Sequence, residues 1–159
     1  MQDVALTTDS RPETGAAVNH PAHYGGDTPF EAIKVIHDWG LGFDVGNALK
    51  YILRAGKKGS AHGDLEKARW YIGNALNSTH QEWFVPARLF LDADDVCRAH
   101  AVRGSLYASV HALSRAASSR QPSTQDGQLR KARQHLEDEI SLYAAEVAIV
   151  PLAGALALS

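Results

Sequence analysis

The part of the chain best suited to bind an anion runs from residue 45 to residue 63. It contains basic residues but no acid, although the whole chain is slightly acidic. Asn47, Lys50 and Arg54 are spaced by three and four residues, so on a helix they share one face. The glycine-rich turn that follows adds Lys57 and Lys58. Together these side chains could form a phosphate-sized anion site. The alternative is a solvated helix face followed by a basic turn.

The glycine-rich turn does not have the spacing of a P-loop. That motif needs a glycine five residues before its Gly-Lys pair, where this chain has Tyr51. It also needs Ser or Thr directly after the lysine, where this chain has Lys58. A P-loop follows a strand, whereas the residues before Gly56 have a helical pattern. The sequence therefore excludes a P-loop at this turn.

The segment 19–24, Asn-His-Pro-Ala-His-Tyr, is the second candidate for chemistry. His20 and His23 could ligate a metal, or they could donate to phosphate and transfer protons near neutral pH. No cysteine or carboxylate lies at ligand spacing beside them, so a zinc site has little support. Alternatively, these imidazoles and Tyr24 pack the loop onto the helices.

The third candidate is the segment 64–71. On a helix, Asp64, Lys67 and Tyr71 line one face, with Trp70 beside it. An aromatic side chain here could stack on a base, or it could belong to the core. Asp64 could equally be a charge that complements the helix dipole.

The first half of the chain is predicted to form three helices. The segment 28–31, Thr-Pro-Phe-Glu, has the pattern of a capping box and predicts a helix that ends at Gly40. The expected apolar positions of this helix are Phe30, Ile33 and Ile36. Apolar stripes predict further helices at 44–55 and 64–76.

The second half is predicted to form two longer helices, at about 86–117, with a bend near 92–95, and at about 126–150. Alternation of period two is absent, so the prediction is an all-α fold of about five helices, a compact helical domain with a C-terminal helical pair. The predicted units are an N-terminal arm (1–17), a site-bearing domain (18–76) and a helical extension (77–159).

Composition narrows the class of protein. The chain has 159 residues, a formal net charge of −2 and one cysteine. Cys97 is predicted to be buried, and a single cysteine permits neither an internal disulfide nor a four-cysteine zinc site. The balanced charge argues against long nucleic acids. The start lacks the pattern of a signal peptide, and the apolar stretch 144–158 is too short and interrupted to span a bilayer, so we expect a cytoplasmic protein without a membrane partner.

Four blocks of sequence carry a resemblance to a known family. They are Val18-Asn19-His20-Pro21-Ala22-His23-Tyr24, Phe30-Glu31-Ala32-Ile33, the segment 43–59 (FDVGNALKYILRAGKKG) and the segment 64–72 (DLEKARWYI). In this order and spacing they resemble a family of small phage-borne helical domains, long known as a domain of unknown function. That family includes the phage T7 nucleotide kinase, which lacks a P-loop. The resemblance covers about residues 18–76.

The resemblance implies a phage origin, hence the host cytoplasm, and a role in deoxynucleotide metabolism. It implies transfer of a phosphoryl group from a nucleoside triphosphate to a (deoxy)nucleoside monophosphate by a homo-oligomer. Mg²⁺ is possible, but no clear ligand set indicates it, and the metal remains unassigned. The matching polar positions are Asn19, His20, His23, Tyr24, Asn47, Lys50, Arg54, Lys57, Lys58, Asp64, Lys67, Trp70 and Tyr71.

Phosphoryl transfer needs charge neutralisation and alignment, and this suggests roles. Lys50, Arg54 and Lys57 would bind phosphates. His20 or His23 would hydrogen-bond the transferred group, and Asp64 would orient the nucleophile or hold magnesium. Tyr24 or Trp70 would stack on the base. An Arg54→Ala variant is then expected to fold but not to bind nucleotide.

Two other functions fit the sequence. The first is a non-catalytic module that binds a nucleotide or sequesters a nucleotide-derived signal. The second is a helical protein that binds a host factor through its Arg-rich second half.

Overall fold

The computed structural model describes residues 19–79 and 82–155, with side chains as far as residue 146. The predicted arm, 1–17, lies outside the described residues. The elements are η1 (Ala22–Tyr24), α2 (Ala32–Asp38), α3 (Phe43–Arg54), α4 (Ala61–Asn77), α5 (Ala93–Ala99), α6 (Gly104–Ser118) and α7 (Pro122–Ala155). The described residues contain no strand beyond one isolated bridge between Leu41 and Phe84. The predicted all-α class is confirmed.

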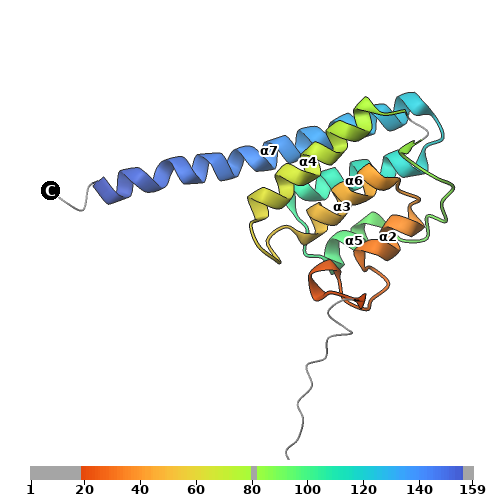
Figure 1. Cartoon of the computed structure of the whole chain (residues 1–159), viewed down its shortest axis with the longest axis horizontal. Helices are drawn as coiled ribbons and strands as arrows, with labels where there is room; N and C mark the ends of the chain where they lie inside the picture. The colour runs from red at the N-terminus through yellow and green to blue at the C-terminus, as the bar shows by residue number, and fades with distance from the viewer. Residues whose placement is uncertain (1–18, 80–81, 156–159) are drawn as a thin grey trace, which may run out of the picture.

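Four helices form the body of the molecule. α3 packs on α4, α4 packs on α7, and α6 packs on both α7 and α3. Figure 1 shows α2 and α5 at one end of this body, with α7 running far past the helices that it covers. The long helices of the second half therefore cover the helices that carry the candidate residues. Within the described residues, no helix is long and apolar enough to cross a membrane.

The helices α3 and α4 follow the predicted stripes. On α3 the inward positions are Val45, Ala48, Leu49, Ile52 and Leu53, all buried. On α4 the buried positions include Leu65, Ala68 and Ile72. α4 begins earlier than predicted because Ser60 caps it, accepting a hydrogen bond from the Gly63 amide at 3.0 Å. Asp64 therefore lies inside the first turn of the helix.

The predicted capping box before α2 is wrong. The Thr28 hydroxyl donates to the Gly25 carbonyl, and the helix starts only at Ala32. The Glu31 carboxylate is buried and contacts His20 and Lys34 instead of a helix amide. The buried face of the helix is Ala32, Val35 and Trp39, whereas Ile33 is half exposed.

The single helix predicted at 86–117 is also wrong. Residues 85–92 are not helical, and Asp92 caps α5, accepting from the Asp94 amide at 2.8 Å. The chain then turns at Ala101, which has a positive φ, and α6 begins at Gly104, which also has a positive φ. α7 starts at Pro122, before the predicted residue 126, because proline suits the first turn of a helix.

The segment 82–91 lies across the junction of α2 and α3. The Gly42 amide donates to the Trp83 carbonyl and the Val85 amide to the Gly40 carbonyl, both at 2.7 Å. A Cβ at Gly42 would lie 1.9 Å from the Glu82 carbonyl oxygen, so this close approach requires glycine. The contact fixes the start of α3.

Candidate functional site

Three cationic side chains converge on the ring of Tyr51. The Lys50 ammonium lies 4.8 Å from the ring centre, the Arg54 guanidinium carbon 4.9 Å and the Lys67 ammonium 5.3 Å. Lys50 and Arg54 come from α3, at the predicted spacing, and Lys67 comes from α4. The contact between the two helices therefore brings the first and third sequence candidates together around one aromatic ring.

The aromatic surface continues from Tyr51 along both helices. The ring of Tyr71 stacks on Tyr51 at 5.8 Å, and Trp70 and Phe43 meet Tyr71 edge-on. Phe43 is 77% exposed and Trp70 62% exposed, so neither is a core residue. We call this surface the cation–aromatic face; it comprises Phe43, Lys50, Tyr51, Arg54, Lys67, Trp70 and Tyr71.

Arg54 is tied to a buried acid. Its Nε donates to Asp64 Oδ2 at 2.9 Å and its Nη2 donates to Asp64 Oδ1, while Nη1 donates to the Tyr24 hydroxyl at 3.1 Å. The hydrogen bonds to Asp64 raise the pKa of Arg54 above its ordinary value. The Asp64 side chain is 3% exposed. This bidentate pair joins α3 to α4 and neutralises much of the Arg54 charge.

The two lysines have weaker partners. Lys50 donates to the Asn47 amide oxygen at 2.7 Å, and Asn47 in turn donates to the Phe43 carbonyl. Among the described residues, no carboxylate lies within ion-pair distance of Lys50 or Lys67. The positive charge available to an anion on this face is therefore that of Lys50 and Lys67.

The basic turn leads to a residue outside the predicted domain. Lys57 Nζ lies 2.9 Å from His100 Nδ1, and His100 Nε2 lies 2.6 Å from the Phe30 carbonyl oxygen. A ring nitrogen facing a carbonyl must donate, so Nδ1 accepts from Lys57. Burial lowers the pKa of His100, and partial desolvation of the ammonium lowers that of Lys57, although Lys57 as a whole residue is exposed. Lys58 is exposed.

The two histidines of the 19–24 segment are separated by the structure. The His23 ring centre lies 4.3 Å from that of Tyr24, with the two rings tilted by 53°. The pKa of His23 is lowered by burial and by the charges of Lys58 and Arg54. His20 points to Glu31, at 3.0 Å, away from this group. Asn19 is exposed at the start of the described residues.

Apart from the exposed Asn19 and Lys58, the predicted candidates fall into two groups. Those on or beside the cation–aromatic face are His23, Tyr24, Asn47, Lys50, Arg54, Asp64, Lys67, Trp70 and Tyr71. His20 and Lys57 contact other partners. Sequence reasoning missed Phe43 on the face, and it missed Glu31 and His100 as contacts. A buried acid 11 residues after His20 gives no local pattern, and His100 lies 43 residues from Lys57.

An open pocket adjoins the face beyond Trp70. It has a volume of about 440 Å³ and lies between α4 and α7. Its lining residues are Glu66, Arg69, Trp70, Gly73, Asn74, Asn77 and Arg133. Chemically, the face and its pocket offer rings on which a flat group can stack and cations for an anionic group.

Comparison with known proteins finds similarity to one family, whose description gives no function. No curated protein and no solved structure matches the chain significantly. One family model matches the segment that carries the helices α2 and α3 and most of α4. Residues 18–73 are similar to the family described as a protein of unknown function (DUF3310).

Proposed function

We propose that the cation–aromatic face binds a nucleotide. The observation that carries this proposal is the convergence of Lys50, Arg54 and Lys67 on the Tyr51 ring, with the exposed Trp70 beside it. A nucleotide combines a flat base with a compact negative charge. The base would stack on the exposed rings, and the phosphates would contact Lys50 and Lys67, which have no carboxylate partner in the described part of the chain.

The finer proposal is phosphoryl transfer from a nucleoside triphosphate to a deoxynucleoside monophosphate. It rests on the family resemblance of the sequence and on the position of His23 beside the cations of the face. Burial and cationic neighbours lower the pKa of His23, so this imidazole is neutral at physiological pH and can donate one hydrogen bond to a phosphoryl oxygen. His20 no longer fits that role, because it pairs with Glu31.

Magnesium does not fit the side chains of the face. Mg²⁺ prefers carboxylate oxygens, and the acid among the predicted site residues, Asp64, holds Arg54 with both oxygens. Asp64 therefore acts in this proposal as a positioning residue for Arg54. No step is assigned to a protein-bound magnesium ion.

Binding without catalysis is the second candidate function. The pairing of Arg54 with Asp64 favours it, because that pairing occupies the strongest cation and the predicted catalytic acid. The face also lies open on the surface of one chain, so a second copy could supply a further wall. Sedimentation velocity with and without nucleotide would detect such an oligomer.

Trp70 provides a direct test of nucleotide binding. Trp39 and Trp83 are buried, so a ligand stacked on the face should quench the fluorescence of Trp70 selectively. We expect quenching by at least one nucleoside mono- or triphosphate. Losing one charged contact weakens binding about tenfold or more, so a Lys50→Ala/Lys67→Ala variant should bind about 100-fold more weakly.

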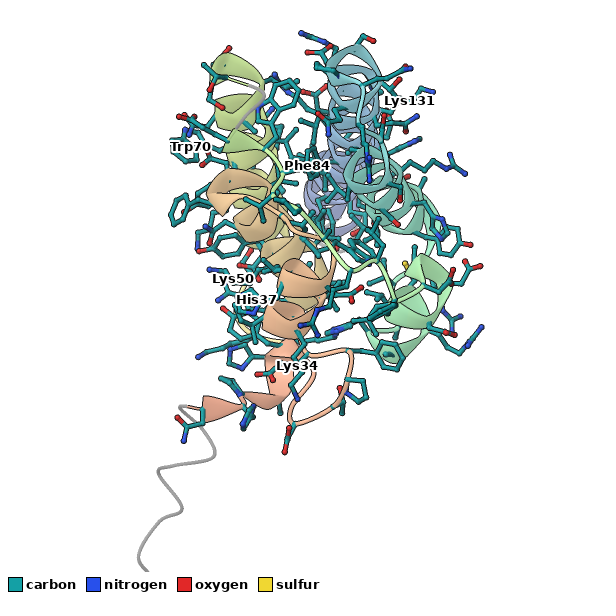
Figure 2. The ribbon with its side chains drawn as sticks, turned by 90° about the vertical axis from the view of Figure 1, so that its right-hand side faces the viewer. Lys34, His37, Lys50, Trp70, Phe84 and Lys131 are labelled. Carbon is teal, nitrogen blue, oxygen red and sulfur yellow. The ribbon has the colours of Figure 1, made fainter. Side chains whose placement is uncertain are left out.

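Lys131→Ala is the matched control, since Figure 2 shows Lys131 on α7 on the other flank of the molecule from Lys50 and Trp70. Absence of quenching with every nucleotide, or equal loss in the control, contradicts the proposal. Incubating each deoxynucleoside monophosphate with a triphosphate and separating the products by chromatography then distinguishes kinase from binder. A kinase yields diphosphate, and a His23→Gln variant should yield much less of it.

A further inference from the structure

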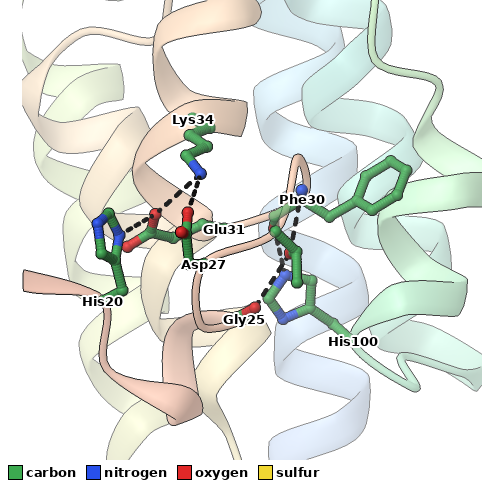
Figure 3. A network of polar contacts seen from close by, with 8 residues as sticks. His20, Gly25, Asp27, Phe30, Glu31, Lys34 and His100 are labelled. Atoms are coloured by element: carbon green, nitrogen blue, oxygen red, sulfur yellow. Dashed lines mark hydrogen bonds and ion pairs between the residues drawn. The ribbon is translucent and has the colours of Figure 1, made fainter. Parts of the chain in front are cut away.

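A second cluster of polar side chains lies away from the cation–aromatic face. His20, Asp27 and Glu31 each offer one nitrogen or oxygen to this cluster, and these three atoms lie within 4.8 Å of one another. Figure 3 shows the Lys34 ammonium beside Asp27 and Glu31, and His20 on the other side of Glu31. The cluster combines an imidazole with two carboxylates, which is a donor set for first-row divalent metals.

The backbone builds this cluster from a tight loop. Gly25 and Gly26 both have positive φ, at 104° and 59°, and the amide of Gly26 bonds back to the Pro21 carbonyl. Glycine adopts this conformation without steric cost. The loop reverses the chain after η1 and returns Asp27 to the start of α2, where Glu31 lies. Residues far from one another in an extended chain therefore meet at one point.

The cluster contains a buried carboxylate, that of Glu31. Its side chain is 3% exposed, so its carboxylate needs compensation from its neighbours. His20 Nδ1 lies 3.0 Å from Glu31 Oε2, and the Lys34 ammonium lies 3.7 Å from the same oxygen and 2.9 Å from Asp27. Two carboxylates thus share one ammonium. With His20 neutral, the cluster keeps a net negative charge.

We propose that His20, Asp27 and Glu31 form a binding site for a divalent first-row transition metal, with Zn²⁺ as the probe ion. In tetrahedral coordination at about 2.0–2.2 Å, neighbouring ligand atoms lie about 3.4 Å apart. The nitrogen of His20 and the oxygen of Glu31 are already closer than this. Asp27 is exposed on its loop and can close the remaining gap. Water completes the coordination, and the imidazole favours zinc over magnesium or calcium.

Lys34 is the internal competitor of the metal. Its ammonium neutralises the same two carboxylates, so it must move away when the ion enters. Lys34 is half-buried but lies at the surface end of the cluster, and its long chain can swing into water. This gives the site an unusual signature. Removing a lysine should tighten binding of a cation, whereas removing any of the three ligands should weaken it.

The test is calorimetric titration of the full chain with ZnCl₂. Loss of a group that merely orients a metal ligand costs about 10–100-fold in affinity, so Asp27→Asn and His20→Ala should each lose at least tenfold. Both residues are exposed, and these variants should fold. Their controls are Asp138→Asn and His37→Ala, which change an exposed acid and an exposed histidine outside the cluster. The controls should bind Zn²⁺ like the parent.

The Lys34→Gln variant decides between this site and adventitious binding to other histidines. We expect it to bind Zn²⁺ about tenfold more tightly than the parent, because the competing charge is gone. Visible absorption of bound Co²⁺ should change in Asp27→Asn and not in Asp138→Asn. Equal affinity of Asp27→Asn and Asp138→Asn, or no gain in Lys34→Gln, overturns the proposal.

Discussion

Replacing Arg54 by alanine should destabilise the fold, rather than act as a neutral test of ligand binding. The sequence alone presents Arg54 as a surface cation whose removal leaves the structure intact. The structure places it in a bidentate pair with Asp64, whose side chain is 3% exposed. Removing the guanidinium leaves that carboxylate buried without its charged partner.

The size of the effect follows from the burial of the pair. The Arg54 side chain is 16% exposed, so the pair is largely shielded from water. Breaking a buried ion pair by deleting one partner costs about 3–5 kcal/mol. The lost hydrogen bond from the Arg54 guanidinium to Tyr24 adds about 1–2 kcal/mol. Against a total stability of about 5–15 kcal/mol, this is a large fraction.

Urea unfolding followed by circular dichroism measures this loss. A double-mutant cycle, made of Arg54→Met, Asp64→Leu and the double variant Arg54→Met/Asp64→Leu, measures the interaction between the two side chains. Replacing both members of a buried pair by apolar groups is often close to neutral. The double variant should therefore recover most of the stability that Arg54→Met or Asp64→Leu loses alone. Arg130→Ala, which breaks an exposed pair with Asp126 on α7, is the control and should change stability little.

The reasoning fails if Arg54→Ala unfolds at the same urea concentration as the Arg130→Ala control. It fails equally if the losses of the two single variants simply add in the double variant, because additivity means that the two side chains do not interact. Either result would mean that Arg54 does not stabilise the fold through Asp64 and behaves as an unpaired surface cation. Binding experiments with this residue would then be interpretable on their own.

Two further predictions concern the second half of the chain. Burial raises the pKa of the Cys97 thiol to about 12. Iodoacetamide at about pH 8 should therefore label Cys97 in urea but not in the native chain. Rapid labelling of the native chain would contradict the burial of Cys97. Asp94 accepts from Tyr107 and His111, which hold its pKa below the ordinary 3.8. The contacts to the ionised Asp94 carboxylate therefore stabilise the fold fully at pH values above the pKa of Asp94 in the unfolded chain. This stabilisation is lost as the pH falls through the lower pKa of Asp94 in the folded chain. The difference in urea midpoint between the parent and Tyr107→Phe should therefore shrink from about pH 5 to about pH 3, and a constant difference would contradict this.

Local pattern was enough to predict the helices of the site. The stripe from Val45 to Leu53 recurs at helical spacing, and burying it stabilises the helix whatever lies opposite. The grouping of Lys50 with Arg54 follows from the same periodicity. These features depend on neighbours within one or two turns, so the sequence alone contains them.

Contacts between residues far apart in the sequence could not be predicted from the local sequence pattern. Glu31 matches the third position of a capping box, yet its carboxylate contacts His20, which lies earlier in the chain. Ala101 adopts a positive φ that its residue type does not indicate, and this turn separates α5 from α6. The pairing of Arg54 with Asp64 depends on which faces of α3 and α4 meet. Which faces meet is determined by the packing of α3, α4, α6 and α7 together.

The link from Lys57 through His100 to the Phe30 carbonyl has a consequence for fragments and relatives of this chain. The family match stops at residue 73, so His100, α6 and α7 all lie beyond it. An excised 18–73 fragment would expose the apolar sides of α3 and α4 to water and leave the basic turn without its histidine. The segment that matches the family, 18–73, is thus shorter than the part of the chain that forms the hydrophobic core. A relative that carries this segment on a different second half must cover the same apolar sides with other residues.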